Sequence, residues 1–155
     1  MIIVEDTRNQ VNKHAAKREW FNQHGIKHIR SKLYCGDYAL LNNQSVAIDT
    51  KKNWLELAGN ICGPQHERFR NECIRAKNAQ IRLIVLVEED CPVEEWKSPK
   101  TRKGTQISRV EPSVLAKAMK TMSQKYGVKF IHCKKSDAAA FIYRILKEVE
   151  INGDN

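Results

Sequence analysis

Three aspartates stand beside apolar segments that are typical of buried β-strands. Asp6 follows an Ile-Ile-Val run, Asp37 precedes Tyr38, and Asp49 ends a Val-Ala-Ile run. An ionised carboxylate beside a buried strand is costly unless it binds a positive partner. Converging carboxylates also repel one another, and a divalent cation that prefers hard oxygen ligands, Mg²⁺ or Mn²⁺, relieves that repulsion. Taken singly, however, an aspartate at a strand end is usually a turn former or a helix cap.

The tripeptide Asp49-Thr50-Lys51 strengthens the metal hypothesis. Side chains alternate along a strand, so Asp49 and Lys51 share one face. A metal held by the carboxylate lowers the pKa of its water, and the lysine stabilises the hydroxide and the charge on an attacked phosphate. Thr50 points to the other face, but its backbone carbonyl could reach the metal. The alternative is a plain salt bridge at Asp49 and a solvated Lys51.

Helices alternate with strands along the chain. This order predicts an α/β sheet with helices on both faces. The expected strands cover residues 2–4, 27–33, 36–41, 45–50, 81–87 and 128–132, and the expected helices cover residues 12–24, 54–61, 65–79, 113–126 and 137–149. Between the last strand-forming residues near 87 and the helix at 113, residues 90–112 are irregular and basic. We expect this stretch to be a flexible loop.

The composition favours a polyanionic partner. The 155 residues include 27 Lys and Arg against 18 Asp and Glu, which gives a net charge of +9, and the pI is about 9.4. Nucleic acid is the first candidate, ahead of an anionic membrane. We expect backbone contacts from Lys52 and, in the irregular stretch, from Lys97, Lys100, Arg102 and Lys103. Trp96 is the best candidate for stacking on a base, although a buried role is the commoner one.

No apolar run is long enough for a membrane span, and the acids in the first residues do not suit a signal peptide. We therefore expect a protein that is not secreted, in the cytoplasm of a prokaryotic or phage-infected cell or in a nucleus. A compact one-domain protein of this kind would suit a phage or a mobile element.

Three ordered motifs resemble those of XPF-type structure-specific nuclease domains. The segment Asp6–Gln10 resembles the opening D-x-R-E motif, and Gly36-Asp37-Tyr38 is similar to the G-D-Y/F motif. The sequence VAIDTK at 46–51 stands where the family has V-E-R-K, and the strand that follows ends in an acid, as in the family. Asn9 replaces the usual Glu, and Asp-Thr-Lys replaces Glu-Arg-Lys. The resemblance covers residues 2–88 and is weaker as far as 149.

This resemblance implies a restriction-endonuclease-like, PD-(D/E)XK, fold with a central mixed sheet flanked by helices on both faces. Residues 1–150 would form a single nuclease domain, followed by a short tail at 151–155. Asp37 and Asp49 would be metal ligands, Lys51 the catalytic lysine and Asp6 a further acid at the site. The resemblance also gives a phosphate-binding or bracing role to Arg8 and phosphate contacts to Gln65 and Arg68.

The implied function is a DNA endonuclease that uses Mg²⁺, or Mn²⁺ in its place, and acts at branched, flap or junction DNA. We expect a homodimer, or a heterodimer with a DNA-binding partner, and Ala138–Leu146 is either the interface or plain core. A Holliday-junction resolvase of the wider superfamily is the nearest enzymatic rival. The other alternative is a non-catalytic nucleic-acid-binding or scaffold subunit. A scaffold has no physical reason to keep Asp37, Asp49 and Lys51 together.

Overall fold

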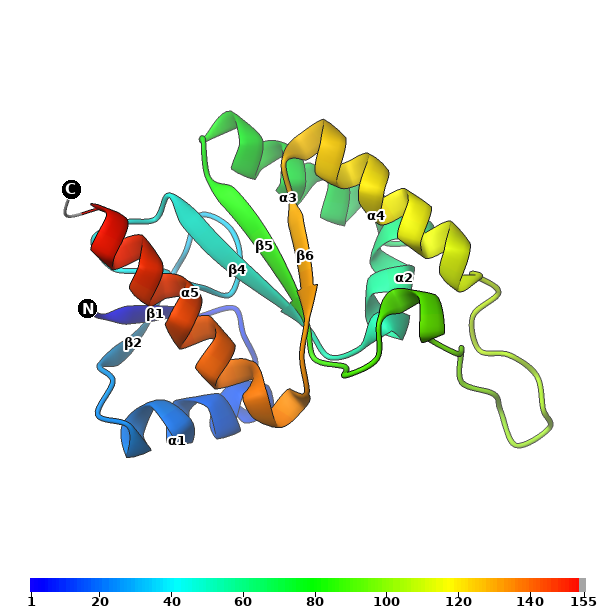
Figure 1. Ribbon diagram of the computed structural model, residues 1–155, viewed down its shortest axis with the longest axis horizontal. Helices are drawn as coiled ribbons and strands as arrows, with labels where there is room; N and C mark the ends of the chain where they lie inside the picture. The colour runs from blue at the N-terminus through cyan, green and yellow to red at the C-terminus, as the bar shows by residue number, and fades with distance from the viewer. Residues whose placement is uncertain (154–155) are drawn as a thin grey trace.

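A six-stranded mixed sheet runs through the centre of the molecule (Figure 1). The computed structural model describes residues 1–153. The strands follow the order β2-β1-β3-β4-β5-β6; β1 pairs in parallel with β2, β3 runs antiparallel to both β1 and β4, and β4, β5 and β6 are parallel. Their bounds are β1 (Ile3–Asp6), β2 (His28–Ser31), β3 (Tyr38–Leu40), β4 (Val46–Lys51), β5 (Arg82–Val87) and β6 (Lys129–His132).

Helices cover both faces of this sheet, which confirms the predicted layer arrangement (Figure 1). On one face lie α2 (Trp54–Cys62), α3 (His66–Asn78) and α4 (Pro112–Tyr126). On the other face lie α1 (Ala15–Gln23) and α5 (Ala138–Gly153). Short 3₁₀ helices occupy Val11–His14, Val93–Glu95 and Lys135–Asp137.

Strand β5 shows why the sheet needs two helical layers. Its Leu83, Val85 and Val87 pack with α2, α3 and α4, while Ile84 and Leu86 pack on the other side with α5. A parallel strand that is buried on both faces needs such a continuous apolar run. The segment Ala138–Leu146 belongs to this second core, where Ala138, Ala139, Ile142 and Leu146 are buried.

Several element boundaries differ from those expected from sequence. Strand β2 ends at Ser31 rather than Leu33, because the backbone N–H of Leu33 donates to Asp6 Oδ1 at 2.9 Å. The first helix begins as a 3₁₀ turn, and regular α-helix starts only at Ala15. Helix α5 continues through Gly153, so residues 151–153 of the expected tail are helical, and residues 154–155 lie outside the described residues.

Candidate active site

The sheet topology brings the three predicted aspartates to one end of three neighbouring strands. Glu5 pairs with Tyr38, and Tyr38 pairs with Ile48. Because β3 is antiparallel to its two neighbours, the residue after Glu5, the residue before Tyr38 and the residue after Ile48 form the next row, which is Asp6, Asp37 and Asp49. The backbone confirms this row: the N–H of Asp6 donates to the carbonyl of Asp37 at 2.8 Å, and the N–H of Asp37 donates to the carbonyl of Ile48 at 2.8 Å.

Gly36 allows this close approach of the chain to β4. Its φ is +76°, and a Cβ at this position would lie 3.1 Å from Ala47 Cβ and 3.1 Å from the Ile48 carbonyl oxygen. Only glycine adopts this backbone conformation without strain and fits the space. The Gly36 N–H donates to Glu72 Oε1 at 3.1 Å, which brings a carboxylate of α3 to the site.

Glu72 is the site residue that the sequence reasoning missed. It lies three residues after Phe69 and directly before Cys73, on the buried side of α3. An acid on the apolar stripe of an amphipathic helix is the signal that could have identified it, since such an acid needs a polar partner.

Asp49 and Lys51 form the ion pair that the strand alternation predicts. Lys51 Nζ lies 2.9 Å from Asp49 Oδ2, and their side chains are only 12% and 9% exposed. The same ammonium lies 5.1 Å from the centre of the Phe69 ring. Within residues 1–153, Lys51 is the one charged group that pairs with Asp49 Oδ2.

Crowding of acids shifts the protonation equilibria of this site. Burial raises the pKa of Asp37 well above its ordinary value, the Asp49 carboxylate raises it further, and the hydrogen bonds from Thr50 oppose the rise. Burial and Asp49 likewise raise the pKa of Glu72. For Lys51, burial lowers the pKa, but Asp49, Glu72 and Asp37 outweigh it and the pKa is raised. Asp37 and Glu72 therefore hold protons more readily than ordinary carboxyl groups, and Lys51 stays protonated.

Asp6 makes structural contacts with both of its carboxylate oxygens. Oδ1 accepts the Leu33 N–H, and Oδ2 accepts from Arg8 Nε at 2.6 Å. Arg8 also donates to the Leu33 carbonyl at 3.0 Å, and its side chain remains 54% exposed. This geometry favours a bracing role for Asp6, and its catalytic role stays a prediction. Arg8 is placed to brace the acid and to face solvent.

Thr50 acts on Asp37 through two groups. Its backbone N–H donates to Asp37 Oδ2 at 2.8 Å and its Oγ1 donates to the same oxygen at 2.7 Å. Thr50 therefore fixes the orientation of Asp37, and a metal contact from its carbonyl stays a prediction. Across the described part of the chain, no group of three or more His, Cys, Asp or Glu side chains is arranged to hold a metal ion.

The residues expected to contact nucleic acid are spread over three regions. Lys52 is exposed beside the site, and Gln65 and Arg68 are exposed at the start of α3. The basic loop extends away from the sheet at the lower right of Figure 1. Its Lys97, Lys100, Arg102 and Lys103 are exposed, and Lys100 pairs with Gln106 in a small antiparallel bridge.

The stacking role considered for Trp96 is wrong in this structure, because Trp96 is 3% exposed and belongs to the core beneath α4. The exposed aromatic near the aspartates is Tyr34, which is 55% exposed and lies two residues before Gly36.

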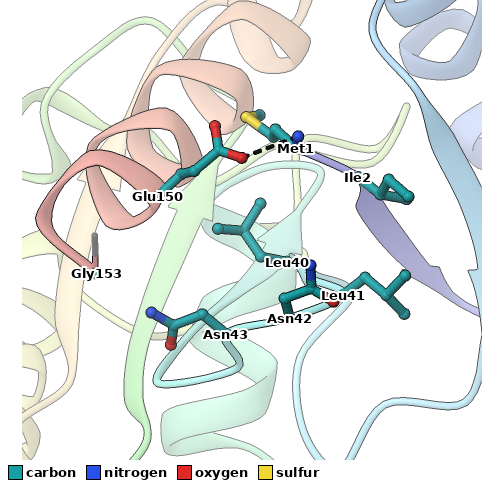
Figure 2. Close-up of a pocket in the computed structure, with 8 residues that line it drawn as sticks. All are labelled: Met1, Ile2, Leu40, Leu41, Asn42, Asn43, Glu150 and Gly153. Carbon is teal, nitrogen blue, oxygen red and sulfur yellow. Dashed lines mark ion pairs between the residues drawn. The ribbon is translucent and has the colours of Figure 1, made fainter.

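A pocket of about 210 Å³ lies at the opposite end of β1 and β3 from the aspartates. Figure 2 shows the residues that line it. There the amino group of Met1 forms an ion pair with Glu150 Oε1 at 2.9 Å, which ties the start of the sheet to α5. No helix within residues 1–153 is long and apolar enough to cross a membrane.

Comparison with known families decides what this arrangement belongs to. The model of the ERCC4 domain matches residues 5–145, which is most of the chain. The chain belongs to the ERCC4 domain family. Members of this family are generally nucleases, and the match confirms the resemblance to XPF-type nuclease domains. Among curated protein sequences, none matches this chain.

Solved structures show the same fold. XPF from Aeropyrum pernix is 16% identical with a TM-score of 0.70, and the match covers 97% of this chain and 65% of that chain. The same protein in complex with DNA is 17% identical with a TM-score of 0.68, over 97% of this chain and 66% of that chain. These likenesses confirm the restriction-endonuclease-like fold. The chain spans just under two thirds of the length of these solved chains.

Proposed function

We propose that this ERCC4 domain is a divalent-metal-dependent DNA endonuclease that acts at branched, flap or junction DNA. One observation carries the proposal: the sheet sets Asp37 beside β4, which bears the ion-paired Asp49 and Lys51, and Glu72 of α3 accepts the N–H of Gly36 next to Asp37. The family adds the expectation of nuclease activity, and the relative whose structure contains DNA supports DNA as the substrate.

The residues present fit a hard divalent cation. Burial and the neighbouring Asp49 carboxylate raise the pKa of Asp37, and Asp49 Oδ2 is buried with the Lys51 ammonium as its partner at 2.9 Å. We propose that these two carboxylates hold Mg²⁺, which Mn²⁺ could replace. Such an ion activates a water molecule and neutralises charge on the phosphate.

Lys51 would stabilise the negative charge that develops on the attacked phosphate. Its pKa is raised, so the side chain remains an ammonium at neutral pH and is unsuited to act as a general base. The ion pair with Asp49 and the Phe69 ring hold the ammonium in place. Thr50 orients Asp37 through the hydrogen bond from its Oγ1. We also propose that the chain acts as a dimer, or together with a partner that supplies further DNA contacts.

The test is cleavage of labelled flap, fork, four-way-junction and plain duplex DNA with Mg²⁺, Mn²⁺ or EDTA. Asp49→Asn and Lys51→Met should each lower the rate by at least about 100-fold, as loss of a group that stabilises transition-state charge does. Asp90→Asn, at an exposed aspartate, is the matched control and should cut like the wild type. DNA binding without cutting in any metal would refute the proposal and favour the non-catalytic subunit.

A further inference from the structure

An open groove of about 440 Å³ runs along the outer side of α3. Every residue that lines it is exposed: Pro64, Gln65, Glu67, Arg68, Asn71 and Arg75. Gln65 and Arg68 were expected from the family resemblance to contact phosphate, but Asn71 and Arg75 belong to no motif considered above. The groove is therefore a surface whose use the catalytic residues do not explain.

The charge of the groove suits an anion. Its lining holds two arginines, Arg68 and Arg75, and one acid, Glu67. Neither guanidinium makes an ion pair or a side-chain hydrogen bond within the described residues, whereas Arg8, Arg18 and Arg30 each pair with a buried carboxylate. Guanidinium groups recognise phosphate with two parallel hydrogen bonds, and two free ones in one groove are available for that purpose.

The spacing suits a polymer with repeated phosphates. Arg68, Asn71 and Arg75 stand at positions i, i+3 and i+7 of α3, which places them on one face of the helix. Seven residues of α-helix span about 10 Å. Neighbouring phosphates of a nucleic-acid strand lie closer together than this, so the two arginines can contact different phosphates of the same strand.

The groove also adjoins the catalytic residues. Glu72 lies between Asn71 and Arg75 in the sequence, and the positive charge of Arg75 acts on the Glu72 carboxylate. Glu72 in turn accepts the N–H of Gly36, the residue before Asp37. A strand that lies along Arg68 and Arg75 is thereby directed to the end of the sheet that carries the aspartates.

We propose that the α3 groove is a backbone-binding site that holds the phosphates of the DNA strand next to the phosphate being cut. The proposal rests on the proposed function for its choice of DNA. Arg75 and Asn71 are then substrate-binding residues, and the groove sets how the strand approaches Asp37 and Asp49.

The test measures equilibrium binding of labelled single-stranded, duplex and flap DNA in EDTA over a range of salt concentrations, so that no cleavage intervenes. Arg68→Ala and Arg75→Ala should each weaken binding several-fold and lower the slope of log affinity against log salt by about 0.7–0.9 per lost phosphate contact. Arg75→Lys should keep most of the slope. Arg70→Ala is the matched control, since Arg70 is an exposed arginine of α3 that does not line the groove.

The proposed binding site is overturned if the double variant Arg68→Ala/Arg75→Ala keeps the wild-type salt slope. It is also overturned if Arg70→Ala loses as much affinity as the groove variants, because that result would indicate general charge attraction. The two proposals fail separately. If binding depends on the groove but the protein never cuts DNA, the proposed binding site stands and the proposed nuclease activity is refuted. If the double variant cuts DNA with the metal and its KM and binding are unchanged, the nuclease activity stands and the proposed binding site is refuted.

Discussion

The buried ion pair behind the site offers the sharpest test of how the fold supports it. Lys17 Nζ of α1 lies 2.9 Å from Glu88 Oε1, and each side chain is only 7% exposed. Lys17→Met leaves the Glu88 carboxylate buried without its partner, which costs about 3–5 kcal/mol of unfolding free energy. In a chain of 155 residues each kcal/mol shifts Tm by about 2–4 °C, so Tm should fall by about 6–20 °C.

Urea unfolding in EDTA, followed by circular dichroism, measures this loss. Replacing both partners in Lys17→Met/Glu88→Leu should recover most of it, because an apolar pair of similar volume substitutes well for a buried ion pair. Lys13→Met, at an exposed lysine nearby, is the control and should change stability by less than about 0.5 kcal/mol. A loss under about 1 kcal/mol in Lys17→Met would refute the reasoning.

The same pair should also affect catalysis. The backbone N–H of Glu88 donates to the Lys51 carbonyl at 2.8 Å, so a displaced Glu88 disturbs the strand end that carries the lysine. At a temperature where both variants remain folded, Lys17→Met should cut DNA more slowly than Lys13→Met. Equal cleavage rates would show that the pair supports stability alone.

Four further predictions follow from single contacts. Asp37→Asn should stabilise the metal-free protein. Because the pKa of Asp37 is raised in the folded state, its protonated carboxyl contributes stability below the unfolded pKa of about 4, and this stability is lost as pH rises through the folded pKa. The gain of the variant over the wild type should therefore grow with pH in denaturation curves. Burial and nearby cations lower the pKa of His14 to about 4, so stability present above about pH 6.5 should be lost as pH falls toward 4, and His14→Gln should flatten that dependence. Thr50→Val removes one donor to Asp37 Oδ2 and should raise the Mg²⁺ concentration needed for half-maximal cutting by about 10–100-fold. A Mg²⁺ titration that gives the wild-type concentration would contradict this prediction. Tyr34→Ala should weaken DNA binding by about 1–3 kcal/mol if the exposed ring stacks on a base, while Tyr34→Phe should bind like the wild type.

The sequence was sufficient for the order of the elements and for the acids on β1, β3 and β4. Apolar runs and glycine breaks identified every strand, and the alternation of Asp49 and Lys51 predicted their shared face correctly. The sequence was insufficient where a side chain takes a backbone N–H that would otherwise bond to the neighbouring strand. Leu33 reads as part of a strand, but the Asp6 carboxylate takes its N–H and ends β2 two residues earlier.

Long-range packing explains the other differences. Glu72 lies 36 positions from Gly36 in the chain, and only the docking of α3 against the sheet joins them. Trp96 stands beside a lysine in an irregular basic stretch, which favours exposure on local grounds. The core beneath α4 nevertheless buries it, because the 3₁₀ turn of Val93–Glu95 directs the chain back toward the helix.

The arrangement of charges distinguishes Asp6 from the other acids at this end of the sheet. Asp6 has a donor on each oxygen, so its charge is already neutralised within the fold, and it braces the segment that leads to Gly36. Asp37 and Glu72 receive hydrogen bonds, yet their pKa values remain raised, first because both are buried and second because the Asp49 carboxylate is near. The fold retains this unfavourable crowding while it neutralises Asp6 fully. For a purely structural role, loss of one of these acids would stabilise the protein, whereas the proposed divalent cation would offset the cost of keeping them together.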